Sequence, residues 1–274
     1  MNRWGSTVRK RFGVSLIGGS GYGAGEVLRF LSNHPDIEVV EVVSRSHAGN
    51  PVASVHSHLT SIGLPELNEA AVARARYITN PGCLATAAAL TLLPLKQETF
   101  IGTVVIDAKT GTSGAGREPQ ASMHHPSRAT DFTAYKALQH RHEPEILQTL
   151  GAEFSAQNSI MFVPHLIPIS RGIFVTTYMT CATEWLPKDV VHTFNEYYKN
   201  SPFIRLRHCA PRLADVVGTN FCDVHVTSRG KQIVAMAALD NLGKGMAGQC
   251  IQNLHIMWGL SSNSALMTPA LGPV

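Results

Sequence analysis

The sequence predicts an α/β plus α+β protein, and three patterns lead to this fold class. First, a short apolar run, a glycine-rich turn, a helix and a second strand follow one another near the N-terminus. Second, the later strands follow one another with few intervening helices, which favours a largely antiparallel sheet. Third, a long terminal helix can return to the first domain. We therefore expect a shortened Rossmann-type nucleotide domain (1–82 plus 240–274) and a mostly antiparallel-sheet domain (83–239).

The composition restricts the class of protein. The 274 residues are 44% apolar and 15% charged, which is typical of a globular chain with room for two domains. The net charge of +4 is concentrated in residues 1–11, read as a basic tail, and does not favour a nucleic-acid partner. Five cysteines without CxxC spacing favour a reducing cytoplasmic location and no metal site. The apolar runs are too short for a membrane span.

The N-terminal unit has the order expected of a dinucleotide-binding motif. We expect a strand over 12–17, a helix over 26–33 and a strand over 37–43. The glycine turn between them matches GxGxxA, whose glycines let the backbone approach a pyrophosphate at the start of the helix. The expected contacts with the nucleotide are Gly18, Gly19, Ser20, Gly21, Tyr22 and Gly23.

The residues after the second strand indicate which dinucleotide binds. NAD sites place an acidic residue there to hold the ribose 2′-hydroxyl. Here Val43 is followed by Ser44, Arg45 and Ser46, which suit a 2′-phosphate. The sequence therefore favours NADP over NAD, and a solvated turn is the alternative.

The remaining elements follow from periodicity and breakers. We expect helices over 65–75, 84–95, 187–199 and 246–259. We expect strands over 76–79, 102–107, 159–163, 172–179, 222–226 and 232–238. Only three strands precede position 83, so the nucleotide domain is thin.

The stretch from Asn80 to Thr86 contains the candidate nucleophile, Cys83. Pro81 and Gly82 precede it, and an Ala/Leu-rich helix follows, so Cys83 is expected at or just before the first helical turn. Free backbone N–H groups and the helix dipole favour a thiolate there. The alternative is a small buried residue that caps the helix.

The loop over 108–117 follows a predicted buried strand and is rich in glycine, hydroxyl groups and cations. Such a loop can donate many hydrogen bonds to a phosphate or carboxylate. The alternative is an ordinary flexible connection.

Taken together, the motifs resemble the N-acetyl-γ-glutamyl-phosphate reductase family, which is related to the aspartate-semialdehyde and glyceraldehyde-phosphate dehydrogenases. The match runs almost from end to end of the chain. The matching segments are 17–23, 44–49, 63–67, 80–83, 107–117, 140–146, 164–172, 218–220 and 240–245.

This resemblance implies NADPH-dependent reduction of N-acetyl-γ-glutamyl phosphate to the semialdehyde, in arginine biosynthesis. It implies that Cys83 attacks the acyl phosphate, that phosphate leaves, and that hydride then reduces the thioester. His142, or else His140, is the acid/base, and two histidines at i and i+2 of a strand or loop can line one site. The resemblance also implies a homo-oligomer, a dimer or tetramer, in which the second domain is catalytic and supplies the interface.

Further site residues are expected from the same resemblance. Candidates for the substrate phosphate or carboxylate are Ser113, Gly114, Arg117 and Arg171. Arg171 can equally form a structural ion pair. Asn241 and Lys244 are expected to border the nicotinamide.

The chain departs from the family pattern at one place. Family members carry a much longer segment where only Thr60 to Gly63 stand here, and that segment completes the parallel sheet and covers the cofactor. A shortened, catalytically impaired binding or assembly subunit is therefore one alternative. Others are the related reductase acting on a carrier-bound aminoadipyl phosphate in lysine biosynthesis, and a cysteine hydrolase, which leaves the glycine turn unexplained.

Overall fold

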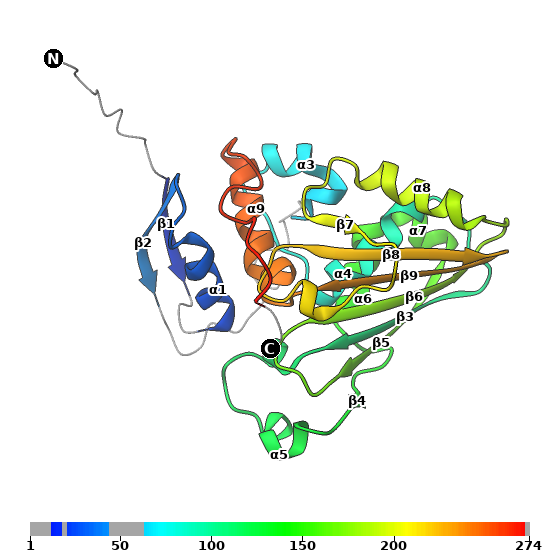
Figure 1. Cartoon of the computed structure of the whole chain (residues 1–274), viewed down its shortest axis with the longest axis horizontal. Helices are drawn as coiled ribbons and strands as arrows, with labels where there is room; N and C mark the ends of the chain where they lie inside the picture. Colours follow the sequence, from blue (N-terminus) through cyan, green and yellow to red (C-terminus); the bar gives the residue numbers. More distant parts are fainter. Residues whose placement is uncertain (1–11, 18–20, 44–62, 272–274) are drawn as a thin grey trace.

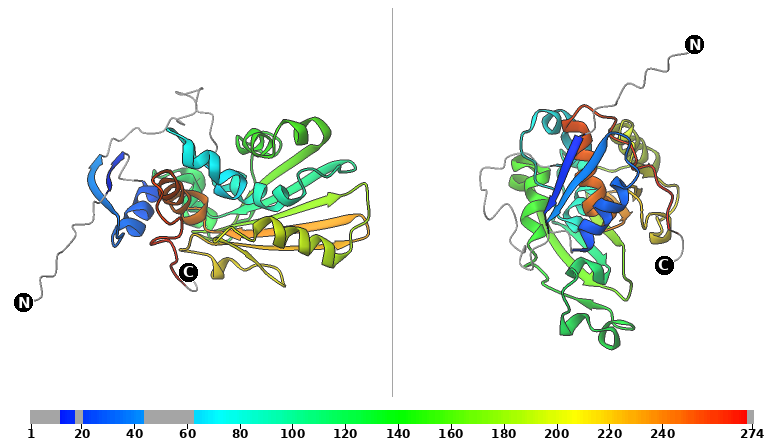
Figure 2. Two further views of the ribbon diagram at one scale, coloured as in Figure 1. Left: turned by 90° about the horizontal axis from the view of Figure 1, so that it is seen from above. Right: turned by 90° about the vertical axis from the view of Figure 1, so that its left-hand side faces the viewer.

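The computed structural model describes residues 12–17, 21–43 and 63–271. A small α/β unit lies at one end of the molecule and a large mixed sheet at the other, with the C-terminal helix α9 between them (Figure 1, Figure 2). The predicted fold class is confirmed: a parallel strand pair with one helix is joined to a larger, mostly antiparallel sheet.

The N-terminal unit is formed by β1 (Phe12–Ile17), α1 (Tyr22–Leu31) and β2 (Ile37–Val43). The two strands pair in parallel, as the predicted β-α-β unit requires. Helix α1 begins four residues earlier than expected, directly after Gly21 in extended conformation. Its first turn therefore includes Gly23, Ala24 and Gly25, the end of the glycine-rich stretch.

The larger sheet has seven strands in the order β4-β5-β3-β6-β9-β8-β7. Four of the neighbouring pairs are antiparallel, whereas β3 with β5 and β7 with β8 are parallel. All the strands predicted beyond position 100 form, and β4 and β7 are additional. The bounds are β3 (Thr103–Thr110), β4 (Thr133–Ala134), β5 (Ser159–Leu166), β6 (Ile173–Thr180), β7 (Ile204–Leu206), β8 (Cys222–Arg229) and β9 (Gln232–Leu239).

The main core lies between this sheet and the helices packed on it. Helix α4 (Cys83–Leu92) is buried from Leu84 to Leu92, because its small and apolar side chains let it lie directly on the sheet. Helix α8 (Pro187–Tyr198) adds Val190 and Phe194 to the same core. The remaining helices are α3 (Pro65–Arg74), α5 (His125–Arg128), α6 (His142–Leu150), α7 (Ala152–Gln157) and α9 (Gly248–Met257).

Short helical turns complete the connections. They are η1 (Leu93–Leu95), η2 (Thr112–Ala115), η3 (Ala121–Met123), η4 (Leu213–Asp215) and η5 (Gly243–Ala247), of which η5 is a π-helical turn. The expected strand over 76–79 is wrong: this segment is irregular, and the Thr79 carbonyl accepts a hydrogen bond from the Gly63 N–H group at 2.9 Å. None of the described helices combines the length and apolarity that crossing a bilayer requires.

A second, smaller core joins α9 to the N-terminal unit. Its buried members include Phe30, Leu31 and Ile251. The ring of Phe12 stacks on Trp258, with centroids 4.6 Å apart and planes 5° apart. The terminal helix therefore returns onto the first domain, as the sequence indicated.

Two buried histidines also connect α9 to this unit. The Nε2 atoms of His34 and His255 lie 2.7 Å apart. His34 Nδ1 accepts the backbone N–H groups of Asp36 and Ile37, so the ring proton of His34 is on Nε2 and is donated to His255. His255 Nδ1 then faces the Ser262 carbonyl at 3.3 Å. Every ring nitrogen of the pair has a partner only while both rings are neutral.

We predict that acid weakens this contact. Burial lowers the pKa of His255 to about 4 and lowers that of His34, so between the ordinary value of 6.5 and about 4 the unfolded chain binds more protons. The stabilising contribution is therefore complete above pH 6.5 and is lost as the pH falls toward 4. In urea denaturation, His255→Asn should lose about 1–3 kcal/mol at neutral pH, because His34 loses a buried acceptor. It should also show a shallower loss of stability on acidification, and a slope equal to that of the unchanged chain would contradict the assignment.

Candidate active site

Cys83 is the first residue of α4, as the sequence predicted. Gly82 precedes it in extended conformation, and no side chain caps the helix, so its first backbone N–H groups face the site. The Gly82 N–H group donates to Glu145 Oε2 at 2.7 Å. This carboxylate of α6 thereby fixes the turn immediately before Cys83.

Two glycines allow close packing around Cys83. A Cβ atom at Gly82 would lie 2.2 Å from His142 Nε2, and one at Gly245 would lie 2.7 Å from the Cβ of Cys83. Both distances are far inside van der Waals contact, so no larger residue fits at either position without a shift. The imidazole of His142 therefore lies directly against Gly82, the residue before Cys83.

The two candidate histidines have different places in the site. His142 begins α6, whereas His140 lies in the loop before it, so the pair is not in a strand. The two rings are 4.7 Å apart, and His140 Nδ1 accepts the backbone N–H of His142 at 3.1 Å. His140 is further enclosed by Tyr135 and Phe162, with ring centroids at 5.5 Å from each. His142 therefore lies directly beside the turn before Cys83, and His140 lies behind it.

Burial, rather than the helix terminus, dominates the protonation states of the site. Desolvation raises the pKa of Cys83 to about 11, although the backbone N–H groups of Leu84 and Cys83 and the charge of Arg141 lower it. Burial also lowers the pKa of His140 to about 4 and that of His142 to about 3. The expectation of a resting thiolate is therefore wrong: the resting site holds a neutral thiol and neutral imidazoles.

The predicted anion loop is held by backbone and amide hydrogen bonds. The N–H groups of Gly111 and Ser113 donate to the carbonyls of Gly172 and Ser170, each at 3.0 Å. Asn241 donates from Nδ2 to Ser113 Oγ at 2.9 Å and accepts the Gly172 N–H at 2.8 Å. Asn241 thus positions the loop that carries Ser113.

Arg171 and Lys244 have partners that differ from those expected. Arg171 Nη1 lies 2.8 Å from Glu26 Oε1, and Nη2 lies 2.8 Å from Asp240 Oδ2, which is the structural ion pair that the sequence left open. Lys244 is fully buried, and its Nζ donates to Glu66 at 2.7 Å and to Gln252 at 2.9 Å. Both cations are therefore paired with carboxylates of the chain itself.

The start of α1 fits a dinucleotide phosphate. No side chain caps its first turn, and its Gly21 and Tyr22 were expected contacts. At Gly23 a Cβ atom would lie 2.4 Å from the sulfur of Met246, so η5 packs directly on this turn. The other expected contacts, Gly18, Gly19, Ser20, Ser44, Arg45 and Ser46, lie outside the described residues.

One segment joins this turn to Cys83. Met246 of η5 touches Gly23, its neighbour Gly245 touches Cys83, and the Met246 carbonyl accepts Asn80 Nδ2 at 3.0 Å. The nucleotide helix and the thiol are therefore separated by a single turn of backbone.

Some site residues were not assigned a role from the sequence. Tyr135 lies near Cys83. Burial raises the pKa of the Tyr135 hydroxyl to about 12, and the charge of Cys83 contributes to this shift. Glu145 and Gly245 lie in the segments 140–146 and 240–245, which match the family. The sequence could therefore have suggested them as site residues, but residue spacing alone does not show what they contact. Arg117 and Gly114 lie in or next to η2, within the loop that Ser113 anchors.

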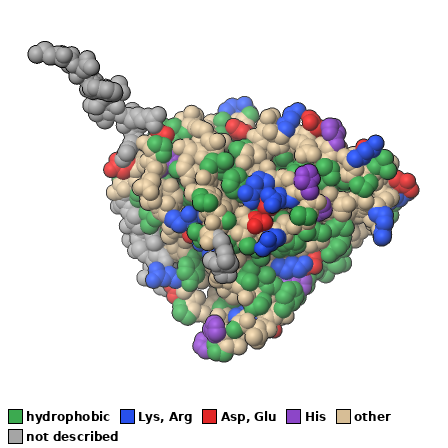
Figure 3. Space-filling view, viewed as in Figure 1, with side chains coloured by type: hydrophobic (Ala, Val, Ile, Leu, Met, Phe, Trp, Pro, Cys, Tyr) green, Lys and Arg blue, Asp and Glu red, His purple; other side chains and the backbone are tan. Residues whose placement is uncertain are grey.

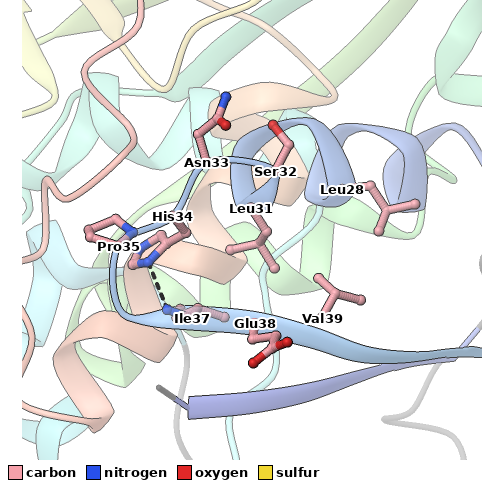
Figure 4. Close-up of a pocket in the computed structure, with 9 residues that line it drawn as sticks. All are labelled: Leu28, Leu31, Ser32, Asn33, His34, Pro35, Ile37, Glu38 and Val39. Carbon is pink, nitrogen blue, oxygen red and sulfur yellow. Dashed lines mark hydrogen bonds between the residues drawn. The ribbon is translucent and has the colours of Figure 1, made fainter. Parts of the chain in front are cut away.

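A separate hollow of about 640 Å³ lies between the end of α1 and β2, where Leu31, Ile37 and Val39 line it (Figure 4). It is at the opposite end of α1 from the glycine turn, so it does not belong to the site around Cys83.

Comparison with known families identifies the class of protein. Residues 13–77 match the NAD-binding domain of semialdehyde dehydrogenases, and residues 83–241 match their dimerisation domain. Among solved structures, aspartate semialdehyde dehydrogenase II from Vibrio cholerae, complexed with ASA, shares the fold, with a TM-score of 0.71 at 14% identity, covering 91% of this chain and 99% of that one. A probable aspartate-semialdehyde dehydrogenase from Pseudomonas aeruginosa gives a TM-score of 0.67 at 14% identity, covering 91% of this chain and 99% of that one. The chain is thus a semialdehyde dehydrogenase-type protein.

Within that class, curated relatives define the family. N-acetyl-γ-glutamyl-phosphate reductases from Methanosarcina acetivorans and Methanopyrus kandleri are each 33% identical to the chain, covering 95% of it and 99% of the relative. The chain belongs to the N-acetyl-γ-glutamyl-phosphate reductase family. The alignment with the first relative runs over 335 residues, more than the 274 of this chain, so that relative carries residues without a counterpart here.

We predict that Cys83 alkylation by iodoacetamide reports a raised thiol pKa. Because burial raises that pKa to about 11, the rate should still be increasing with pH above the ordinary value of 9.0. Peptide mass spectrometry would follow Cys83 beside the exposed Cys209 in the same sample, with Cys83→Ser as the control. A rate at Cys83 that reaches its plateau near neutral pH would show a thiolate and contradict this assignment.

Proposed function

We propose that this chain reduces N-acetyl-γ-glutamyl phosphate with NADPH to N-acetylglutamate 5-semialdehyde, as a step of arginine biosynthesis. Family membership supports the reaction and its substrate. The observation that carries the proposal is local: Cys83 begins α4, His142 lies against Gly82, and Gly245 and Met246 connect this turn to the start of α1.

In the acylation step, the sulfur of Cys83 attacks the acyl carbon of the substrate. A carbon–sulfur bond forms, the bond from that carbon to the phosphate oxygen breaks, and inorganic phosphate leaves with the bonding electrons. The thiol proton passes to the imidazole of His142, which is neutral at rest and therefore able to accept it. A raised thiol pKa makes this proton transfer part of the attack rather than a step before it.

The first turn of α4 is placed to stabilise the negative charge that develops on the acyl oxygen. The N–H groups of Cys83 and Leu84 face the sulfur and have no side-chain cap to compete for them. Together with the helix dipole they can hold an oxyanion. When the aldehyde forms, the oxyanion regains its carbon–oxygen double bond and the carbon–sulfur bond breaks. Protonated His142 would hydrogen-bond the oxyanion until then and return its proton to the Cys83 sulfur.

The nucleotide would be held by the amides of the first turn of α1, at Gly21 to Gly23. Bound NADPH supplies the hydride that reduces the acyl group, and Ser44 to Ser46 would bind its 2′-phosphate. Ser113, Gly114 and Arg117 are proposed to hold the substrate's anionic groups, with Asn241 fixing Ser113.

A second candidate is an impaired family member that acts as a binding or assembly subunit. It is favoured by one observation: in the described part of the chain, the sheet of the nucleotide unit consists of β1 and β2 alone. A two-stranded parallel sheet leaves a long edge at β2 and covers less of a dinucleotide than a full domain does.

We further propose a cytoplasmic homo-oligomer, a dimer or tetramer. The match to a dimerisation domain over 83–241 supports this assembly. The sheet face opposite α4 exposes large apolar side chains, among them Met161 (39% exposed) and Tyr178 (45%), which suit burial against a second copy.

We retain 1–82 with 240–274 as the proposed nucleotide domain and 83–239 as the catalytic and dimerisation domain. On the face shown in Figure 3, cationic and anionic side chains are interspersed rather than segregated.

We predict that replacing His142 lowers kcat much more than replacing His140. His142→Asn should lower kcat about 10²–10⁴-fold, because the proton acceptor is lost, whereas His140→Asn should cost roughly tenfold or less. Loss of NADPH absorbance with the acyl phosphate measures both, and Cys83→Ser is the inactive control. The reverse ranking would contradict the assigned roles. A chain that acylates Cys83 yet never oxidises NADPH would favour the impaired subunit over the reductase.

A further inference from the structure

A buried ion network joins the nucleotide helix to the catalytic domain. At its centre is Arg171, which lies in the turn between β5 and β6 and pairs with Glu26 of α1 and with Asp240 after β9, each at 2.8 Å. Side-chain exposure is 16% for Arg171, 10% for Glu26 and 0% for Asp240. Three segments that are far apart in sequence therefore meet at one guanidinium.

The backbone on both sides of Arg171 holds the anion loop. The Ser170 carbonyl accepts the N–H of Ser113, and the Gly172 carbonyl accepts the N–H of Gly111. The packing is close, since a Cβ atom at Gly111 would lie 2.8 Å from the Ser170 carbonyl. A displacement of Arg171 would therefore move the loop that carries Ser113.

Asp240 holds the other side of the same loop. Its Oδ1 accepts the N–H groups of Leu242 at 2.8 Å and Gly243 at 3.1 Å, which shapes the chain around Asn241. Asn241 bonds Ser113 directly. The residues next to Arg171 and Asp240, Ser170 and Asn241, thus both hydrogen-bond with Ser113.

The third partner, Glu26, lies one turn beyond the glycine-rich start of α1. Burial alone would raise its pKa, but hydrogen bonds from Arg171 and Arg29 hold that pKa below its ordinary value. Glu26 is therefore a buried carboxylate with two cationic partners, and it fixes the rotation and position of α1. Loss of either partner would leave a buried charge insufficiently paired.

We propose that Arg171 is a positioning residue that couples α1, and with it the bound dinucleotide, to the Ser113 loop and the acyl group on Cys83. This role rests on the proposed function. Guanidinium geometry suits it, because one planar group contacts two carboxylates at once, whereas the single ammonium of lysine cannot reproduce both contacts.

Separate measurement of the two chemical steps tests the coupling. Acylation of Cys83 needs no nucleotide but does use the Ser113 loop, so Arg171→Met should slow acylation, followed as phosphate release without NADPH, by only about threefold. Hydride transfer in a single turnover should fall at least about tenfold, because misplacement by an ångström is enough to cost that much. Arg171→Lys should recover part of this loss. Glu26→Gln should slow hydride transfer similarly, with little further loss in the double variant.

A matched control removes a comparable ion pair elsewhere. Arg205 pairs with fully buried Asp223 at the β7–β8 edge of the large sheet, so Arg205→Met should reduce stability while leaving the ratio of the two rates unchanged. Equal slowing of acylation and hydride transfer in Arg171→Met, or the same pattern in the control, would overturn the proposal.

Hydrogen–deuterium exchange gives a readout that needs no turnover. In Arg171→Met, exchange should increase together in α1 and in residues 111–116, whereas Arg205→Met should leave both unchanged. Faster exchange in only one of these segments would overturn the coupling even if the chain proved inactive as a reductase. If the unchanged chain fails to acylate Cys83, the proposed function fails, while this exchange result still decides the proposal.

Discussion

The packing of the His142 imidazole against the backbone of Gly82 is the constraint on which the site depends. A Cβ atom at position 82 would lie 2.2 Å from Nε2, so the ring and the turn occupy adjoining space that only glycine leaves open. Glu145 secures the same turn through the Gly82 N–H group. Helix α6 therefore supplies both the ring and the carboxylate that define where Cys83 begins α4.

This close packing has an electrostatic consequence. Burial of the Cys83 thiol and of the His142 imidazole removes the water that would stabilise their charged forms. It therefore raises the pKa of Cys83 and lowers that of His142. The site consequently stores no thiolate. In the proposed reaction the thiol must therefore lose its proton as it attacks, so the position of the His142 ring matters more than its resting charge.

Helix α9 and the network at Arg171 place the nucleotide unit relative to this site. The small sheet of β1 and β2 has few neighbours of its own in the described structure, so its position depends on contacts made elsewhere. These contacts are the stack of Phe12 on Trp258, the His34–His255 pair and the Glu26–Arg171 ion pair. A shortened domain can thus be held by the helix that returns to it.

Local patterns were sufficient for most elements and for the position of Cys83. Apolar alternation predicted β5, β6, β8 and β9, and the glycine-rich turn predicted the β1-α1-β2 unit. The pattern could not show which partners long side chains find: the buried hydrogen bond from Lys244 to Glu66, for example, was not predicted. The expectation of a resting thiolate at Cys83 was wrong for a related reason. The desolvation of the thiol depends on how α6 and η5 pack around it, and the position of Cys83 at the start of a helix does not reveal that packing.

The most direct test of the account is the acylation rate of Gly82→Ala, measured as phosphate release from the acyl phosphate in the absence of NADPH. The added methyl group overlaps the imidazole of His142, so the rate should fall about 100-fold or more while the circular dichroism spectrum stays that of the folded chain. Acylation at the unchanged rate would show that the contact between Gly82 and His142 does not organise the chemistry.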